Sequence, residues 1–563
     1  MLFTIFACIY ISLVCWAWGI IFTRLLKKIT GQVTELSFSI TCITGLSFII
    51  SILGILSLFI PLGGWMIQLL FLLPSMFVLS AEYKSIFKQN VKDSFSLHPP
   101  SLFLLLISIM VILVMSTWKI IHPDTLGYHA QLIQWAEKYR VIPGLVNLNT
   151  RYGLQSNWFL ACAFFSFKFT GSQALVFLNT AVLFWFILFI VNKINRYLTG
   201  NENRLMGFLW LFLLGFSFWS YTQIRLMATS ASPDFFAVIL VLTTLYIFVE
   251  KKEYGETTYY PGYFLITLFS ATAITVKLSA LPVLFIVALL FFFLLKQKKI
   301  KFALISAGII FILLLPLLAR NVITSGYPLF PSVYGSFPVD WKLGEETTRQ
   351  IAGYVTVYSR TAISYTNPAV QQILIMKWTE WIPLWWKVLS TADKTIMCLL
   401  VLSIITAFAF AGKVFRSGWK KIISLVICFT GLVFWFILAP DPRFGFGFIV
   451  GFIGIICIIV FPENNIVLTG FIKKAATVSV LITGLLLSVY IVYRFKNFYS
   501  GNLWLKPMGT EKVEYKSVNC GGLKINIPLN NPGCGDTAIP CAYDSCSFFT
   551  PRGNEIINGF RLK

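Results

Sequence analysis

The chain has 563 residues, of which 57% are hydrophobic and 12% charged, with a mean hydropathy of +0.80. About a quarter of the residues in a typical soluble domain are charged, so this composition excludes a soluble multidomain enzyme with a single anchor. The formal net charge is +23, from 45 basic and 22 acidic residues. The basic residues lie mainly in short clusters between apolar runs, which indicates cytoplasmic helix ends and anionic lipid rather than nucleic acid.

Apolar runs long enough to cross about 30 Å of hydrocarbon recur along the chain. They lie near residues 2–23, 36–60, 65–80, 101–120, 173–191, 205–222, 232–249, 262–295, 302–319, 395–411, 422–438, 446–461 and 476–493. The run at 262–295 is long enough for two crossings, and residues 159–169 could form one more short helix. We therefore expect an all-α multi-pass membrane protein with about 13 to 15 spans, whose first run is retained rather than cleaved as a signal peptide.

Charge bias predicts which ends of the spans face the cytoplasm. Basic residues follow the first and third runs and recur at 296–301 and 413–421. Counting crossings from these clusters places three segments on the outer side, namely loops 121–157 and 320–391 and the tail from about residue 495. The expected organisation is N-terminal helices over 1–100, a membrane core over 101–494, and an extracytoplasmic domain over 495–563.

The eleven cysteines fall into two groups. Seven lie within apolar runs, where a thiol is usually inert packing. The other four are Cys520, Cys534, Cys541 and Cys546, in a polar stretch rich in glycine and proline. An even number of cysteines in an outer segment predicts two disulfides. Zinc is the competing interpretation, but the gaps between these cysteines contain neither a CxxC pair nor a histidine.

The strongest polar cluster follows the fourth apolar run. Residues 121–129 read Ile-His-Pro-Asp-Thr-Leu-Gly-Tyr-His. His122 and His129, two of only three histidines in the chain, flank Asp124 within eight residues, and Tyr128 lies between them. The stretch that follows, 130–140, has the pattern of an amphipathic helix lying in the membrane interface. The pattern predicts that Asp124 is held at the outer end of a span.

Two interpretations of Asp124 follow from the residues alone. A carboxylate at a membrane edge is usually functional, and here it could take a proton from an acceptor hydroxyl beside a lipid-borne donor. The simpler alternative is that Asp124 caps the interfacial helix, because aspartate is common at helix starts. Capping alone does not explain the paired histidines or the length of the segment, so we favour the catalytic interpretation.

This arrangement resembles the GT-C superfamily of polytopic glycosyltransferases, in which an aspartate in the first large outer loop directly follows a span and precedes an interfacial helix. Two further segments are similar to patterns of the same class. Ala319–Pro331 contains an Arg-Asn, Gly and Pro pattern, and Ala439–Phe444 forms a short turn with an arginine and an aromatic residue. The whole chain, with its Cys-rich ending, also resembles a set of bacterial membrane proteins described only as uncharacterised.

The resemblance implies a GT-C-like core that transfers a sugar from a polyprenyl-phosphate carrier to a lipid, glycan or protein acceptor, at the outer face of a bacterial cytoplasmic membrane. It implies that Asp124 is the general base or, in metal-using branches, a ligand of a divalent ion with support from His122 and His129. The leaving phosphate or diphosphate needs a cation held in place. The predicted substrate-binding residues are Arg443, Arg320, Arg151, His122, His129 and Tyr128.

Arg443 ranks first among the arginines because it lies in a turn bounded by prolines, although Asp441 could simply pair with it. Arg320 and Arg151 could equally mark helix ends. The other charged residues singled out near or within apolar runs are Arg225, Asp234 and Lys277. A lysine in such a place commonly snorkels to an interface. Four tryptophans between residues 378 and 386 fit an aromatic belt better than a sugar-binding platform.

Two other functions compete with sugar transfer. A polymerase or ligase of lipid-linked oligosaccharides would use outer arginines rather than Asp124. A transporter or flippase would need polar groups near the bilayer midplane and recognisable repeats, whereas the polar clusters here gather at one face. The expected partners are the lipid-linked donor, the acceptor and membrane lipids, without nucleic acid, and a divalent metal ion is the one cofactor left open.

Overall fold

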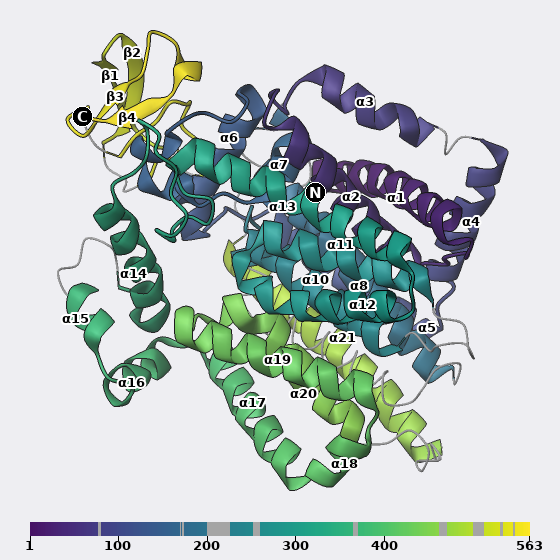
Figure 1. Ribbon diagram of the computed structural model, residues 1–563. Coiled ribbons are helices and arrows are strands. Elements are labelled where there is room, and N and C mark those ends of the chain that lie inside the picture. Colours follow the sequence, from purple (N-terminus) through teal and green to yellow (C-terminus); the bar gives the residue numbers. More distant parts are fainter. Residues whose placement is uncertain are drawn as a thin grey trace.

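The computed structural model describes residues 1–76, 80–168, 171, 174–199, 226–250, 259–363, 370–460, 470–498, 510, 512–529, 533–543 and 546–563. Within these ranges the body of the protein is helical, and four short strands lie in the C-terminal tail (Figure 1). A helix satisfies its own backbone N–H and C=O groups, which lipid cannot do. The expected helical body with a small disulfide-bonded tail is confirmed.

Within the described ranges, the first half of the chain contains ten α-helices and three short helical turns in loop 121–157. The α-helices are α1 (Leu2–Thr30), α2 (Phe38–Leu56), α3 (Trp65–Met76), α4 (Ala81–Phe95), α5 (Pro99–Ser116), α6 (Ala130–Lys138), α7 (Asn157–Phe164), α8 (Ala174–Leu198), α10 (Pro233–Glu250) and α11 (Tyr260–Val276). A π-helical turn, η2 (Thr125–His129), precedes α6, and the 3-10 turns η3 (Leu145–Asn147) and η4 (Thr150–Gly153) follow it.

The second half adds the remaining helices and the tail. They are η7 (Leu278–Val283), α12 (Leu284–Lys296), α13 (Ile300–Ser325), α14 (Glu345–Thr361), α15 (Val370–Ile375), α16 (Trp378–Val388), α17 (Thr391–Ala409), α18 (Ala411–Arg416), α19 (Trp419–Leu438), α20 (Pro442–Val460) and α21 (Gly470–Phe498). The tail contains β1 (Tyr515–Cys520), β2 (Leu523–Pro528), β3 (Phe549–Pro551), the 3-10 turn η8 (Ile556–Asn558) and β4 (Phe560–Leu562).

Nine helical segments within the described ranges are long and apolar enough to cross a membrane. They are α1, α2, α5, α8, the continuous η7 and α12, α13, α17, α19 and α20. Four shorter apolar helices, in α3, α10, α11 and α21, accompany them. The run at 262–295 forms two helices, α11 and α12, and the run at 205–222 lies outside the described residues. The chain is therefore a multi-pass membrane protein.

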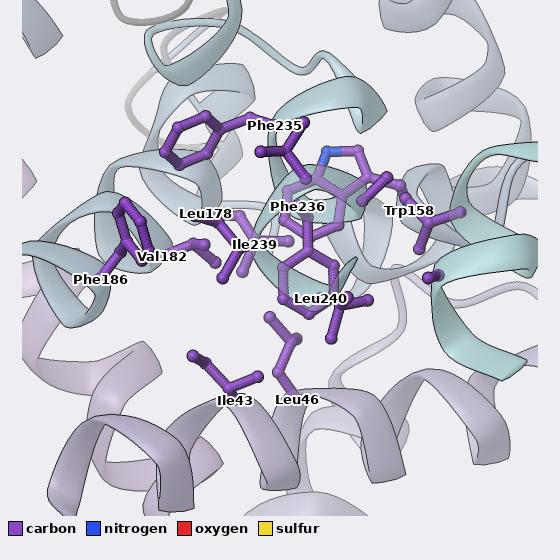
Figure 2. Packing of buried hydrophobic residues seen from close by; sticks show 14 of the residues in the cluster. Ile43, Leu46, Trp158, Leu178, Val182, Phe186, Phe235, Phe236, Ile239 and Leu240 are labelled. Atoms are coloured by element: carbon purple, nitrogen blue, oxygen red, sulfur yellow. The ribbon is translucent and has the colours of Figure 1, made fainter. Parts of the chain in front are cut away.

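Large apolar side chains from distant parts of the chain pack together inside the body. Figure 2 shows Trp158 of α7 beside Phe236 of α10, with Ile43 and Leu46 of α2 facing them. The ring centroids of Trp158 and Phe236 are 5.0 Å apart, and both side chains are fully buried. Small residues let helices approach closely in lipid. At the α1–α2 crossing, a Cβ added to Gly45 would lie 1.7 Å from a backbone oxygen of α1.

The tail consists of two antiparallel strand pairs, β1 with β2 and β3 with β4, held by two disulfides. Cys520 pairs with Cys546, and Cys534 pairs with Cys541. Both disulfides predicted from the cysteine count are therefore confirmed, and the zinc interpretation of these four residues is wrong.

The three segments predicted to lie on the outer side share one face of the molecule. Asn147 of the first loop donates to the Trp341 carbonyl of the second loop at 2.9 Å. Arg552 of the tail binds Asp340 through two hydrogen bonds of 2.8 and 3.0 Å. Phe560 N–H in β4 donates to the Pro143 carbonyl at 3.0 Å. In Figure 1 the yellow tail accordingly lies beside α6, at the end of the molecule from which α14 also extends.

Truncation of Phe236 tests the packing in Figure 2. Phe236→Ala removes a fully buried ring that contacts Trp158, and the cavity left behind should destabilise the protein by about 3 kcal/mol or more. The matched control is Phe285→Ala on α12, because that ring is 59% exposed on the apolar surface of the helix. Thermal unfolding in detergent should show a clear fall in midpoint for the first variant and little change for the second. Equal midpoints would contradict this packing.

Candidate functional site

Asp124 begins the π-helical turn η2 that follows the loop after α5. Its carboxylate makes no capping hydrogen bond to the backbone of that turn. Instead, Oδ2 of Asp124 lies 3.2 Å from Nη1 of Arg443, a residue 319 positions further along the chain. Asp124 is 30% exposed and Arg443 9% exposed. The capping interpretation is therefore wrong, and the carboxylate forms an ion pair between two distant segments.

Arg443 is placed by the turn that links α19 to α20. Pro442 starts α20, where its missing N–H and fixed φ suit the first helical position. Two indoles hold the turn: Trp385 donates to the Pro440 carbonyl at 2.7 Å, and Trp435 donates to the Asp441 carbonyl at 2.6 Å. The start of α20 and the turn before it therefore fix the position of Arg443 together.

The Arg443 guanidinium is shared between two carboxylates. Its Nε donates to Oδ2 of Asp441 at 2.8 Å while Nη1 contacts Asp124. Asp441 also accepts the Arg443 backbone N–H at 3.1 Å, so it fixes both ends of the arginine. Hydrogen bonds between charged groups are about twice as strong as neutral ones, and two such bonds also fix orientation. The alternative that Asp441 pairs with Arg443 is confirmed, but Asp124 pairs with it as well.

The two histidines complete the cluster around Asp124. The Thr125 N–H lies 3.1 Å from Nδ1 of His122 and 3.1 Å from the His122 carbonyl oxygen, so the two acceptors share this donor. His122 Nε2 lies 3.4 Å from Arg443 Nη1, so the imidazole adjoins the guanidinium that binds Asp124. His129 contacts Thr125 Oγ1 through Nδ1 at 3.2 Å, and its ring centroid is 5.5 Å from that of His122. We call Asp124, His122, His129, Arg443 and Asp441 the Asp124 cluster.

Burial and charge set the protonation of the cluster. Burial lowers the pKa of His122 to about 4, and burial also lowers the pKa of His129 well below its ordinary value. Burial by itself raises the pKa of Asp124, but the surrounding cations, Arg443 foremost, outweigh it and hold that pKa well below its ordinary range. At neutral pH the cluster therefore contains ionised Asp124 and two neutral imidazoles.

A small pocket adjoins the cluster between α10, η7 and α20. Its lining combines polar groups of Asp234, Lys277, Ser279 and Arg443 with apolar side chains of α10 and α20. Lys277 Nζ lies 2.6 Å from Asp234 Oδ1, so this lysine pairs with a carboxylate. The pocket has a volume of about 10 Å³, which is room for about one water molecule. A sugar phosphate could enter only if its walls moved.

Phe444 connects the pocket to the cluster. The ring lies 4.9 Å from the guanidinium carbon of Arg443 and 4.1 Å from Nζ of Lys277. One aromatic ring therefore contacts two cations, each through the attraction between positive charge and a π-face. Asp234 and Lys277 are the residues whose importance sequence reasoning underrated. The signal was present, since two opposite charges in apolar runs need each other as partners.

Arg151 and Tyr128 lie beside the cluster without direct bonds to Asp124 among the contacts described. Arg151 extends over Gly127, where its Nη1 would lie 3.0 Å from an added Cβ, and it faces the Tyr354 ring at 5.8 Å. Tyr128 packs edge-on against His129, with centroids 4.4 Å apart, and burial raises its pKa well above the ordinary value. Tyr128 therefore packs against His129, while Arg151 lies against the turn at Gly127.

Arg320 serves a different region from the one its sequence motif suggested. It is buried in α13, donates to Ser57 Oγ at 2.8 Å and to Asn157 Oδ1 at 3.2 Å, and reaches the Gly54 carbonyl at 3.4 Å. These bonds join α13 to the C-terminal end of α2 and the start of α7. The structure brings Arg443 to Asp124 but gives Arg320 this interhelical role.

Two other expectations concern residues near the cluster. Trp381 and Trp385 of α16 are buried, whereas Trp378 and Trp386 are 63% and 40% exposed, so only two of the four indoles are available to a membrane interface. Arg225 lies outside the described residues.

A metal-binding arrangement was the alternative use of Asp124, His122 and His129. Across the ranges that the structure describes, no three histidine, cysteine, aspartate or glutamate side chains are grouped to hold a metal ion. His122 Nδ1 and His129 Nδ1 are each engaged by Thr125. The described donor set does not fit a three-ligand site.

Fold and site together define the class: a multi-pass α-helical membrane protein with a disulfide-bonded tail and a charged cluster at one face. The chain belongs to the family described as a domain of unknown function (DUF8201), which matches residues 1–450. That range contains the whole Asp124 cluster and the adjoining pocket. No curated protein and no solved structure matches the chain.

The shifted histidine pKa predicts a pH dependence of stability. Between pH 6.5 and about 4, His122 binds a proton in the unfolded chain but stays neutral in the folded one, so stability is lost as pH falls. The loss should reach about 3 kcal/mol across this window. The thermal midpoint should therefore fall less between pH 7.5 and pH 5 in His122→Asn than in the wild-type protein.

The matched control for this pH experiment is His98→Asn, since His98 is exposed just before α5. That variant should keep the wild-type pH dependence. A His122→Asn variant with the full wild-type fall in midpoint would show that His122 does not carry the effect.

Proposed function

We propose that the protein transfers a sugar from a polyprenyl-phosphate-linked donor to a hydroxyl acceptor, with Asp124 as the general base. The observation that carries the proposal is the ion pair between Asp124 and Arg443, beside a pocket that contains a second cation, Lys277. A base beside fixed cations is what transfer from a phosphate carrier needs. The GT-C resemblance supports the same reaction class.

The ion pair makes Asp124 a weak base until a substrate arrives. An incoming phosphate competes for Arg443, because guanidinium binds phosphate oxygens as well as carboxylates. When Arg443 turns to the phosphate, Asp124 loses its main countercharge and its burial raises its pKa. Donor binding therefore increases the basicity of the carboxylate at the moment when a proton must be accepted.

The transfer step is then balanced in charge and atoms. The acceptor oxygen forms a bond to the anomeric carbon, and the bond from that carbon to the carrier phosphate oxygen breaks with its electron pair. The acceptor proton moves to Asp124. Arg443 and Lys277 stabilise the growing charge on the departing phosphate. We expect this reaction at the outer face of a bacterial cytoplasmic membrane, because charge bias predicts an outer position for loop 121–157 and the GT-C resemblance implies that membrane.

The direct test compares two carboxylates that share the same arginine. Asp124→Asn removes the proposed base, whereas Asp441→Asn removes the other partner of Arg443 and leaves Asp124 in place. Both proteins, reconstituted into liposomes, would be given polyprenyl-phosphate and polyprenyl-diphosphate sugars with crude membrane acceptors. We expect Asp124→Asn to lower kcat by at least about 100-fold, and Asp441→Asn to lower it by about 10-fold or less.

Two further measurements make this result decisive. Thermal midpoints and membrane insertion of both variants should match the wild-type protein within a few degrees, which excludes misfolding as the cause. If the wild-type protein transfers sugar and Asp124→Asn does so at the same rate, Asp124 is not the base. Movement of a labelled carrier across the vesicle, with its sugar bond intact, would instead support a flippase.

A further inference from the structure

The tail contains a loop that reaches the Asp124 cluster. We call residues 533–543 the disulfide loop, because the Cys534–Cys541 bond closes it. Both cysteines and Ala542 are fully buried, whereas Asp536 and Ala538 are exposed, so one side of the loop packs into the protein. It lies beyond residues 1–450, the range that the family match covers.

The disulfide loop binds the turn that carries the cluster. Gly535 N–H donates to the Leu126 carbonyl at 2.8 Å, and the Tyr543 hydroxyl donates to the Gly127 carbonyl at 2.7 Å. Gly533 packs backbone against backbone, since a Cβ there would lie 3.0 Å from the Leu126 oxygen. Two consecutive carbonyls of η2, two and three positions after Asp124, are thus held by the tail.

The opposite side of the loop is held by the elements that follow η2. Gln131 of α6 donates to the carbonyls of Gly535 and Thr537 at 3.2 and 2.7 Å. Tyr152 of η4 donates to the Cys541 carbonyl at 3.0 Å, and both Gln131 and Tyr152 are fully buried. Buried amide and phenol groups need such partners, so the loop is part of the interior of loop 121–157.

A stabilising cap would need only surface contacts, yet two of these hydrogen bonds go to η2 and the others to buried side chains of α6 and η4. That turn begins directly after Asp124 and ends at His129, so a shift of the turn would move the carboxylate relative to Arg443. The Arg151 guanidinium also lies close to this turn, 3.0 Å from where a Cβ on Gly127 would be. We propose that the disulfide loop positions Asp124 against Arg443, which makes the tail a working part of the site. The coupling between the disulfide loop and η2 does not depend on the reaction that the protein catalyses. Its effect on catalysis rests on the proposed function.

Tyr543 offers the most specific test of the coupling between the disulfide loop and η2. Tyr543→Phe keeps the ring and removes the hydroxyl, which donates to the Gly127 carbonyl and also contacts the side chains of Asn149 and Arg151. The matched control is Tyr515→Phe, which removes a phenol hydroxyl from an exposed position on β1. Hydrogen exchange of purified, lipid-reconstituted protein should show amides of residues 122–131 exchanging about 10-fold faster in Tyr543→Phe alone. Thermal midpoints should stay equal.

The disulfides provide a second pair of variants. Cys534→Ser/Cys541→Ser should raise exchange at 122–131, whereas Cys520→Ser/Cys546→Ser should raise exchange mainly within β1 and β2. In the transfer assay, Tyr543→Phe should lower kcat about 10-fold and leave the KM for the donor within about 2-fold, as expected of a positioning residue.

Each outcome decides a separate question. Unchanged exchange at 122–131 in both Tyr543→Phe and Cys534→Ser/Cys541→Ser would overturn the coupling. Faster exchange in a protein whose wild type transfers no sugar would support the coupling and reject the proposed function. Faster exchange with unchanged kcat would show that the loop holds η2 without positioning the base, and would overturn the catalytic part.

Discussion

The ion pair between Asp124 and Arg443 is the contact on which the arrangement of the site depends. In a body with few charges and little water, a carboxylate or guanidinium without a partner is expensive. Pairing these two residues requires the turn after α5 and the turn before α20 to meet, although 319 positions separate them. The indoles of Trp385 and Trp435 hold one turn, and the disulfide loop holds the other. The site is therefore assembled from a helix start, a π-helical turn and a tail.

The same requirement explains the pairs around the cluster. Asp234 is almost fully buried and Lys277 lies beside it at the break between α11 and η7. The break matters because a continuous helix from α11 to α12 would have no irregular backbone at which to place Ser279 in the pocket. Lys277 and Arg443 then contact one ring, Phe444, so positive charge extends from the pocket to the carboxylate of Asp124.

Sequence reasoning predicts the parts of the protein that depend on composition. Hydropathy identifies most of the helices. Because charged residues are scarce, Asp124 and Arg443 stand out as residues that need a partner or a function. Sequence reasoning ranks Arg443 above Arg320 only through the prolines around Arg443, because each is a rare arginine near a helix end. The difference lies in their partners: Ser57 and Asn157 for Arg320, against two aspartates for Arg443. Those partners come from distant positions, and short motifs carry no information about them. The docking of the tail onto η2 was equally hidden, since its hydrogen bonds go to backbone carbonyls.

Sharing one guanidinium between two carboxylates also bears on the order of substrate binding. Asp441 binds Arg443 through both its backbone and its side chain, so this partner stays in place when Asp124 is released. An anion that takes the Nη1 side of Arg443 therefore displaces Asp124 in particular. A neutral acceptor hydroxyl cannot do this, because it offers no charge to replace the carboxylate. If the cluster transfers sugars, the phosphate-linked donor must bind first, and the acceptor meets a carboxylate whose pKa has already risen.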